Sequence, residues 1–117
     1  MKFTNEQMFQ CIVAMHDLHE TGKLGYAIAR NMRKMMDAAK EYLDIREEVL
    51  KKYGTDQGDG RYLIPQENTE AFWNEISEYA TIEHDVDVFH VSADEFMSGG
   101  MDSEQMFILD WMVEEGS

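Results

Sequence analysis

The first part of the chain repeats its hydrophobic positions with the period of an α-helix. The repeating positions are Met8, Cys11, Ile12, Met15, Leu18 and His19. Because residues three or four apart lie on the same side of a helix, this stripe predicts one buried helical face. The segment Thr4-Asn5-Glu6-Gln7 has the pattern of a capping box, so we expect the helix to begin there and to end near Gly22.

A second helical stripe runs from Leu24 to Tyr53 without a proline. Its hydrophobic members are Ile28, Met32, Met35, Met36, Ala39, Leu43, Val49 and Leu50. At 1.5 Å per residue, roughly 30 residues would form one helix about 45 Å long. Gly54 then predicts its C-terminus. The simplest arrangement of the two helices is an antiparallel hairpin over residues 5–53.

The second half of the chain contains strand patterns. A glycine-containing turn at residues 55–60 leads into a short strand candidate at 61–64, which Pro65 stops. Residues 82–91 alternate with a period of two, which is typical of a strand with one buried face. We expect this strand to pair with residues 61–64.

Helix-capping residues predict three further helices. Asn68 is expected to cap the first, a capping box at residues 92–95 begins the second, and Asp102 caps the last. The predicted fold class is therefore α+β and helix-dominated, with an N-terminal antiparallel helical hairpin, a small antiparallel β-sheet and a C-terminal helix. A length of 117 residues fits a single domain over residues 1–117, with an acidic α/β half at about 61–117.

Charge separates the two halves of the chain. All ten Lys and Arg residues and ten carboxylates lie in residues 1–61, whereas residues 62–117 hold fourteen carboxylates and no Lys or Arg. The net charge of -14 argues against direct binding of nucleic acid or an anionic membrane, because a polyanion needs cations facing it. With no apolar run of about 18 residues and no signal-peptide pattern, we expect a cytoplasmic protein.

Three carboxylates alternate along the predicted strand. Glu83, Asp85 and Asp87 would project from one strand face about 6.7 Å apart, close to the spacing of successive phosphates in an extended nucleic acid. The flanking helices add Glu75, Glu78, Asp94 and Glu95. We predict that these seven residues form a partner-binding surface that resembles a nucleic-acid strand in charge. The alternative is the solvated face of a half-buried strand.

The residue types of catalysis and metal binding are present without the spacing of a site. Cys11 lies in a hydrophobic stripe and is expected to be buried and unreactive. His84 and His90 would be about 20 Å apart on a strand, too far for one ion. His16 and His19 are three residues apart, but no HExxH pattern accompanies them, and His19 is expected to close the buried stripe. We therefore predict no catalytic residues, no metal, no cofactor and no enzyme activity, although metal binding by either histidine pair stays open.

Four segments support a resemblance that spans the chain. They are Met1-Lys2-Phe3-Thr4-Asn5-Glu6-Gln7, Ala27-Ile28-Ala29-Arg30-Asn31, Tyr53-Gly54 and Leu109-Asp110-Trp111-Met112. With them the chain resembles small acidic proteins encoded by phages and prophages of Gram-positive bacteria. The resemblance implies a phage setting, in which proteins of this size often help to build the particle or disable a host defence. Among the latter, anti-CRISPR proteins are commonly small and acidic, and several kinds act as nucleic-acid mimics.

Charge and resemblance together give two functional expectations. The first is a phage-encoded inhibitor whose acidic half blocks the basic groove of a nucleic-acid-binding host protein, such as a CRISPR nuclease. The second is a structural or assembly protein of the phage particle that uses the hairpin for self-association. A stable higher oligomer buried through the face with Met32, Met35 and Met36 would favour assembly, whereas a monomer or a loose homodimer would favour inhibition.

Overall fold

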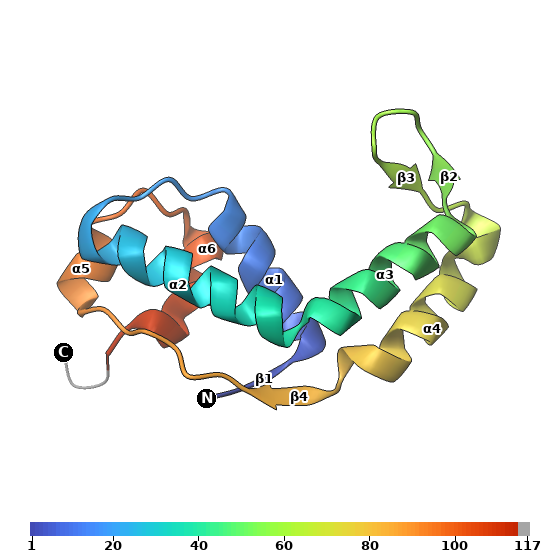
Figure 1. Ribbon diagram of the computed structural model, residues 1–117. Coiled ribbons are helices and arrows are strands. Elements are labelled where there is room, and N and C mark those ends of the chain that lie inside the picture. Colours follow the sequence, from blue (N-terminus) through green and yellow to red (C-terminus); the bar gives the residue numbers. More distant parts are fainter. Residues whose placement is uncertain (115–117) are drawn as a thin grey trace.

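A computed structural model describes residues 1–114 of the chain (Figure 1). Its helices are α1 (Asn5–His16), α2 (Gly22–Ala38), α3 (Lys40–Tyr53), α4 (Thr69–Ala80), α5 (Ala93–Met97) and α6 (Ser103–Leu109). Its strands are β1 (Lys2–Thr4), β2 (Thr55–Asp56), β3 (Tyr62–Leu63) and β4 (Glu83–Asp85). Two 3₁₀ turns, at Gln66–Asn68 and Asp110–Met112, precede α4 and follow α6. The predicted helix-dominated α+β class is confirmed.

Helix α1 begins at the predicted capping box. The Gln7 N–H donates to Thr4 Oγ1 at 3.1 Å, and the Thr4 N–H donates to Gln7 Oε1 at 2.7 Å. The predicted end at Gly22 is wrong, because α1 ends at His16 and Gly22 instead opens α2. Gly22 has a φ of 67°, which a residue without a Cβ adopts easily. This glycine therefore turns the chain into the next helix.

The predicted single helix from Leu24 to Tyr53 is wrong, because the chain changes direction at Ala39 between α2 and α3 (Figure 1). Ala39 is fully buried and has φ and ψ of -96° and 8°, away from helical values. Helix α2 packs on α1 as predicted, but α3 packs on α4, so the hairpin over residues 5–53 is only half correct. The molecule has two helical pairs in place of one.

Each helical pair has its own hydrophobic cluster. Cluster one lies among α1, α2, α5, α6 and residues 86–91, and includes Met8, Met15, Ile28, Met35 and Leu109. Cluster two lies between α3 and α4 and consists of Tyr42, Val49, Phe72 and Ile76. In Figure 1, the α3/α4 pair extends away from the rest of the fold and carries the β2–β3 hairpin at its far end.

The predicted strand at 82–91 and its pairing with 61–64 are also wrong. Only residues 83–85 form a strand, β4, and it pairs antiparallel with β1, where Phe3 lies opposite His84. Residues 62–63 pair with 55–56 across the glycine turn. Strand β1 has three residues, so its ladder with β4 covers only residues 83–85 of the 82–91 segment.

A buried asparagine replaces the missing strand partner. Asn31 of α2 is fully buried, its Nδ2 donates to the Phe89 carbonyl at 3.0 Å, and its Oδ1 accepts from the Phe89 N–H at 2.7 Å. One amide side chain therefore satisfies both backbone groups of Phe89, as a neighbouring strand would. Further along, Val91 forms an isolated bridge with Val113. Residues 86–91 are thus held to the helices without belonging to a sheet.

Gly25 in α2 lies against the backbone of Glu20. A Cβ at this position would lie 2.8 Å from the Glu20 carbonyl carbon and closer still to its oxygen. We expect Gly25→Ala to lower the free energy of unfolding by about 1–3 kcal/mol, although alanine is the better helix former. Urea denaturation measures this change, and Arg33→Ala on the exposed side of α2 should shift it by less than about 0.5 kcal/mol. A Gly25→Ala variant as stable as the wild type would contradict the close approach.

Candidate protein-binding surface

The seven predicted binding residues lie on three consecutive elements and the segment between them. Glu75 and Glu78 are on α4, Glu83 and Asp85 on β4, Asp87 just after β4, and Asp94 and Glu95 in the first turn of α5. In Figure 1 this stretch follows one edge of the molecule, from α4 along β4 to α5. The backbone segments that carry the seven residues therefore follow one another along one edge.

The alternation of exposed and buried residues extends past the end of β4. Glu83, Asp85 and Asp87 are exposed, whereas Val86 and Val88 between and after them are buried. The period of two thus describes the exposure of residues 83–88 correctly, but it fails at the ends of the predicted strand, where Ile82 and His90 are exposed and Val91 is buried. The three alternate acidic residues are therefore all exposed.

One of these three acidic residues is paired with the N-terminus. The Met1 ammonium donates to Asp85 Oδ1 at 2.9 Å, and Lys2 lies opposite Asp85 in the β1–β4 ladder. The pKa of Asp85 is lowered mainly by the hydrogen bond from the Met1 ammonium. The positive charge of the ammonium and, to a smaller extent, that of Lys2 lower it further. Asp85 is therefore not an uncompensated charge.

Glu75 forms an ion pair with a lysine of α3. Lys52 Nζ lies 2.6 Å from Glu75 Oε1, and the Tyr53 hydroxyl donates to the same oxygen at 3.0 Å. The hydrogen bond from Lys52 is the main reason that the pKa of Glu75 is lowered and that of Lys52 is raised. The α3/α4 packing brings this pair together across the two halves of the chain.

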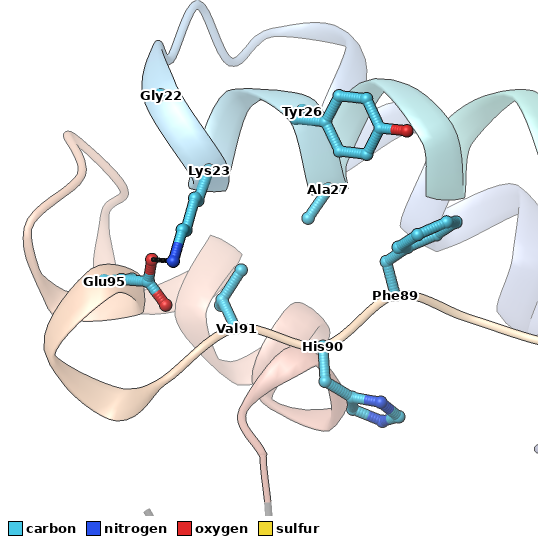
Figure 2. Close-up of a pocket in the computed structure, with 8 residues that line it drawn as sticks. All are labelled: Gly22, Lys23, Tyr26, Ala27, Phe89, His90, Val91 and Glu95. Atoms are coloured by element: carbon cyan, nitrogen blue, oxygen red, sulfur yellow. Dashed lines mark ion pairs between the residues drawn. The ribbon is translucent and has the colours of Figure 1, made fainter.

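The Glu95 carboxylate accepts a hydrogen bond at the start of its own helix. Its side chain accepts from the Ser92 N–H at 3.0 Å in the predicted capping box, and this hydrogen bond is the main reason that the pKa of Glu95 is lowered. Lys23 Nζ of α2 lies 4.0 Å from the other carboxylate oxygen (Figure 2). The idea of an acidic half without compensation is therefore wrong for Asp85, Glu75 and Glu95.

Four of the seven carboxylates stay open to a partner. Within residues 1–114, the side chains of Glu78, Glu83, Asp87 and Asp94 are exposed and make no ion pair. The Asp87 carbonyl, but not its carboxylate, accepts from Lys34 Nζ at 2.7 Å. Lys34 also lies over the Phe89 ring, 5.0 Å from its centroid. The composition alone did not reveal this cation beside the acidic residues.

A pocket of about 360 Å³ lies next to α5, between the start of α2 and residues 89–91 (Figure 2). Tyr26 and Phe89 meet edge to face at its wall, with ring centroids 5.8 Å apart, and the Lys23–Glu95 pair closes another side. Figure 2 shows the His90 ring pointing away from Tyr26 and Ala27. The exposed lining of the pocket is mainly apolar, and the Lys23–Glu95 ion pair lies at one side of it.

Cys11 lies in the core, whereas His16, His19 and His90 lie at the surface. Cys11 is buried in cluster one, as predicted, and burial raises the pKa of its thiol. His16, His19 and His90 are exposed, so the expectation that His19 closes the stripe of α1 is wrong, because that helix ends before it. Across residues 1–114, no group of three or more His, Cys, Asp or Glu side chains is arranged to hold a metal ion.

The predicted self-association face is mostly interior. Met35 is fully buried and Met32 packs against cluster one, whereas Met36 alone of the three is exposed. The methionines of α2 therefore serve mainly to fill the core between α1 and α2, as unbranched side chains do.

In comparisons with known proteins, no protein family, curated protein or solved structure matches this chain. In the part of the chain that the structure describes, none of the helices is both long enough and hydrophobic enough to cross a lipid bilayer.

Proposed function

We propose that this chain is an acidic binding protein that occupies a basic nucleic-acid-binding groove on a partner protein. The observation that carries the proposal is the set of four exposed carboxylates of Glu78, Glu83, Asp87 and Asp94, which make no ion pair within residues 1–114. They belong to α4, β4, the segment after β4 and α5, which together follow one edge of the fold (Figure 1), in the half of the chain that contains no Lys or Arg. Their carboxylates would stand where the partner normally holds phosphates.

Electrostatics explains how such a surface competes with a nucleic acid. A groove built for phosphates carries Lys and Arg side chains and their counterions, which a row of carboxylates displaces as a nucleic acid does. The net charge of -14 also steers the chain toward a basic surface and raises the association rate. Binding would therefore inhibit the partner by excluding its nucleic acid.

The resemblance to small acidic phage proteins suggests which partner to try first. In a phage setting, the proposed partner is a host defence factor with a basic groove, and a CRISPR nuclease is the leading example. Inhibition then requires no catalytic residue in this chain, only a surface that the groove accepts.

Displacement of labelled DNA from a panel of purified basic nucleases, CRISPR effector nucleases included, tests the proposal. We expect displacement at about 50 mM salt that weakens roughly tenfold or more at about 200 mM. Replacing the four open carboxylates by Glu78→Gln, Glu83→Gln, Asp87→Asn and Asp94→Asn should weaken displacement at low salt by about tenfold or more.

The matched control removes four charges elsewhere. Asp37→Asn, Glu41→Gln, Glu48→Gln and Glu67→Gln change exposed carboxylates and leave the same net charge as the first variant. We expect this control to stay within about twofold of the wild type, because only long-range steering is affected. Equal losses in the two variants, salt-independent binding or no displacement from any nuclease would each refute the proposed surface.

A further inference from the structure

A groove of about 600 Å³ lies between α1 and α6. Phe9, Val13 and Ala14 of α1 and Phe107 and Ile108 of α6 supply its apolar walls. None of the seven predicted binding residues lines it, so it is a second surface.

Two apolar side chains that line this groove are exposed to solvent. Phe107 is 81% exposed and Val13 is 49% exposed. Helix α6 is fixed to cluster one by Leu109, which is fully buried, so Phe107 is not needed to attach the helix. Leaving a phenylalanine in water forgoes the stabilisation that burial would give, and apolar side chains gathered around a groove mark an interaction site.

The rim of the groove is acidic. Asp17 at the end of α1, Asp102 at the start of α6 and Glu104 in its first turn line the groove, and no Lys or Arg does. His16 Nδ1 lies 3.6 Å from Asp17 Oδ1, and Arg46 stacks on Phe9 with its guanidinium 3.8 Å from the ring centroid. Arg46 Nη2 also lies 3.9 Å from Glu6 Oε1, so the positive charge of Arg46 is balanced by the Glu6 carboxylate.

We propose that this groove binds a basic amphipathic helix of a partner protein. The apolar side of that helix would lie against Phe107 and Val13, in the manner of a helix seated in a groove between two others. Its Lys and Arg side chains would face Asp17, Asp102 and Glu104. A second copy of this chain is the wrong occupant, because the same acidic rims would meet across a two-fold interface and each copy carries a net charge of -14.

Three synthetic peptides, each about five helical turns long, test this occupant by fluorescence anisotropy at about 0.15 M salt. The first has Leu and Phe on one face and Lys on the other, the second has Glu in place of Lys, and the third has the composition of the first in scrambled order. We expect the first to bind at least about tenfold more tightly than either of the others. Equal binding of the ordered and scrambled Lys peptides would overturn the proposal, because charge alone would then explain it.

Variants of the protein locate the peptide. Phe107→Gln should weaken the Lys peptide about tenfold, and Asp17→Asn with Glu104→Gln about fivefold, whereas Leu63→Gln should have less than a twofold effect. Leu63 is 65% exposed on the β2–β3 hairpin and serves as the matched apolar control, and far-UV circular dichroism checks that each variant folds. Unchanged binding in Phe107→Gln would overturn the proposal.

Two further measurements distinguish this surface from its alternatives. The variant with the four neutralised carboxylates of α4, β4 and α5 should keep peptide binding within about threefold, and Phe107→Gln should keep DNA displacement, so either surface can fail without the other. Sedimentation equilibrium tests the second copy as occupant. A stable wild-type dimer that Phe107→Gln dissociates would assign the groove to self-association and overturn the proposal.

Discussion

Replacing Asn31 with alanine is expected to lower the free energy of unfolding by about 3 kcal/mol. The substitution removes both hydrogen bonds to the Phe89 backbone and leaves its N–H and carbonyl unsatisfied beside cluster one. Each unsatisfied group costs about 1–3 kcal/mol, and the lost side chain leaves a small cavity in addition. Urea denaturation followed by circular dichroism measures the loss.

Asn74→Ala is the matched control for this substitution. Asn74 is exposed on α4, so its replacement should change the stability by less than about 0.5 kcal/mol. Asn31→Ala should also accelerate amide hydrogen exchange, relative to the wild type, most strongly at Phe89 and its neighbours, because their attachment to α2 is lost. A stability loss below about 1 kcal/mol would mean that water replaces the asparagine amide without difficulty, contrary to its full burial.

The elements that the sequence predicts correctly are those set by local interactions. The capping boxes at residues 4–7 and 92–95 are present, and Asp102 accepts from the Gln105 N–H at the start of α6. These hydrogen bonds join residues three apart, so a short window of sequence contains all of their partners. The turn predicted at 55–60 is present at 57–60 for the same reason, with Gly58 and Gly60 in the positive-φ region, whereas residues 55–56 form β2.

The break at Ala39 leaves no trace in the hydrophobic pattern. Ile28, Met35, Tyr42 and Val49 recur every seven residues straight through it, yet the first two belong to cluster one and the last two to cluster two. Seven residues make nearly two full helical turns. One hydrophobic stripe with unchanged spacing can therefore pack against α1 in helix α2 and against α4 in helix α3. Only the packing of α3 on α4 reveals the change of direction.

The acidic surface could be predicted only in part. The exposure of Glu83, Asp85 and Asp87 follows from the period of two, which is a local property. The pairs Lys52–Glu75 and Met1–Asp85 join residues far apart in the sequence, so charge counting by halves treats those carboxylates as free when they are not. The role of Asn31 cannot be predicted from the sequence, because its partner Phe89 lies 58 residues away.

Replacing Ile76 with alanine is expected to lower the stability of the α3/α4 pair by about 2–5 kcal/mol. Ile76 is 1% exposed and is one of the four buried residues that form cluster two within the described chain. Such a small cluster cannot refill the space that the deleted side chain leaves. Hydrogen exchange should therefore show faster opening of α3 and α4, while α1 and α2 keep their protection because cluster one is untouched.

Leu109→Ala provides the comparison, because it makes a cavity of similar origin in cluster one. It should reduce protection in α1, α2 and α6 instead, so the two variants together show whether the clusters open separately. Equal loss of protection in all these helices with Ile76→Ala would show that the clusters unfold as one unit. Separate opening has a functional consequence, since α4 carries Glu78. Ile76→Ala should then displace Glu78 from the proposed surface while Glu83 and Asp94 keep their places, and weaken DNA displacement less than neutralising all four carboxylates does.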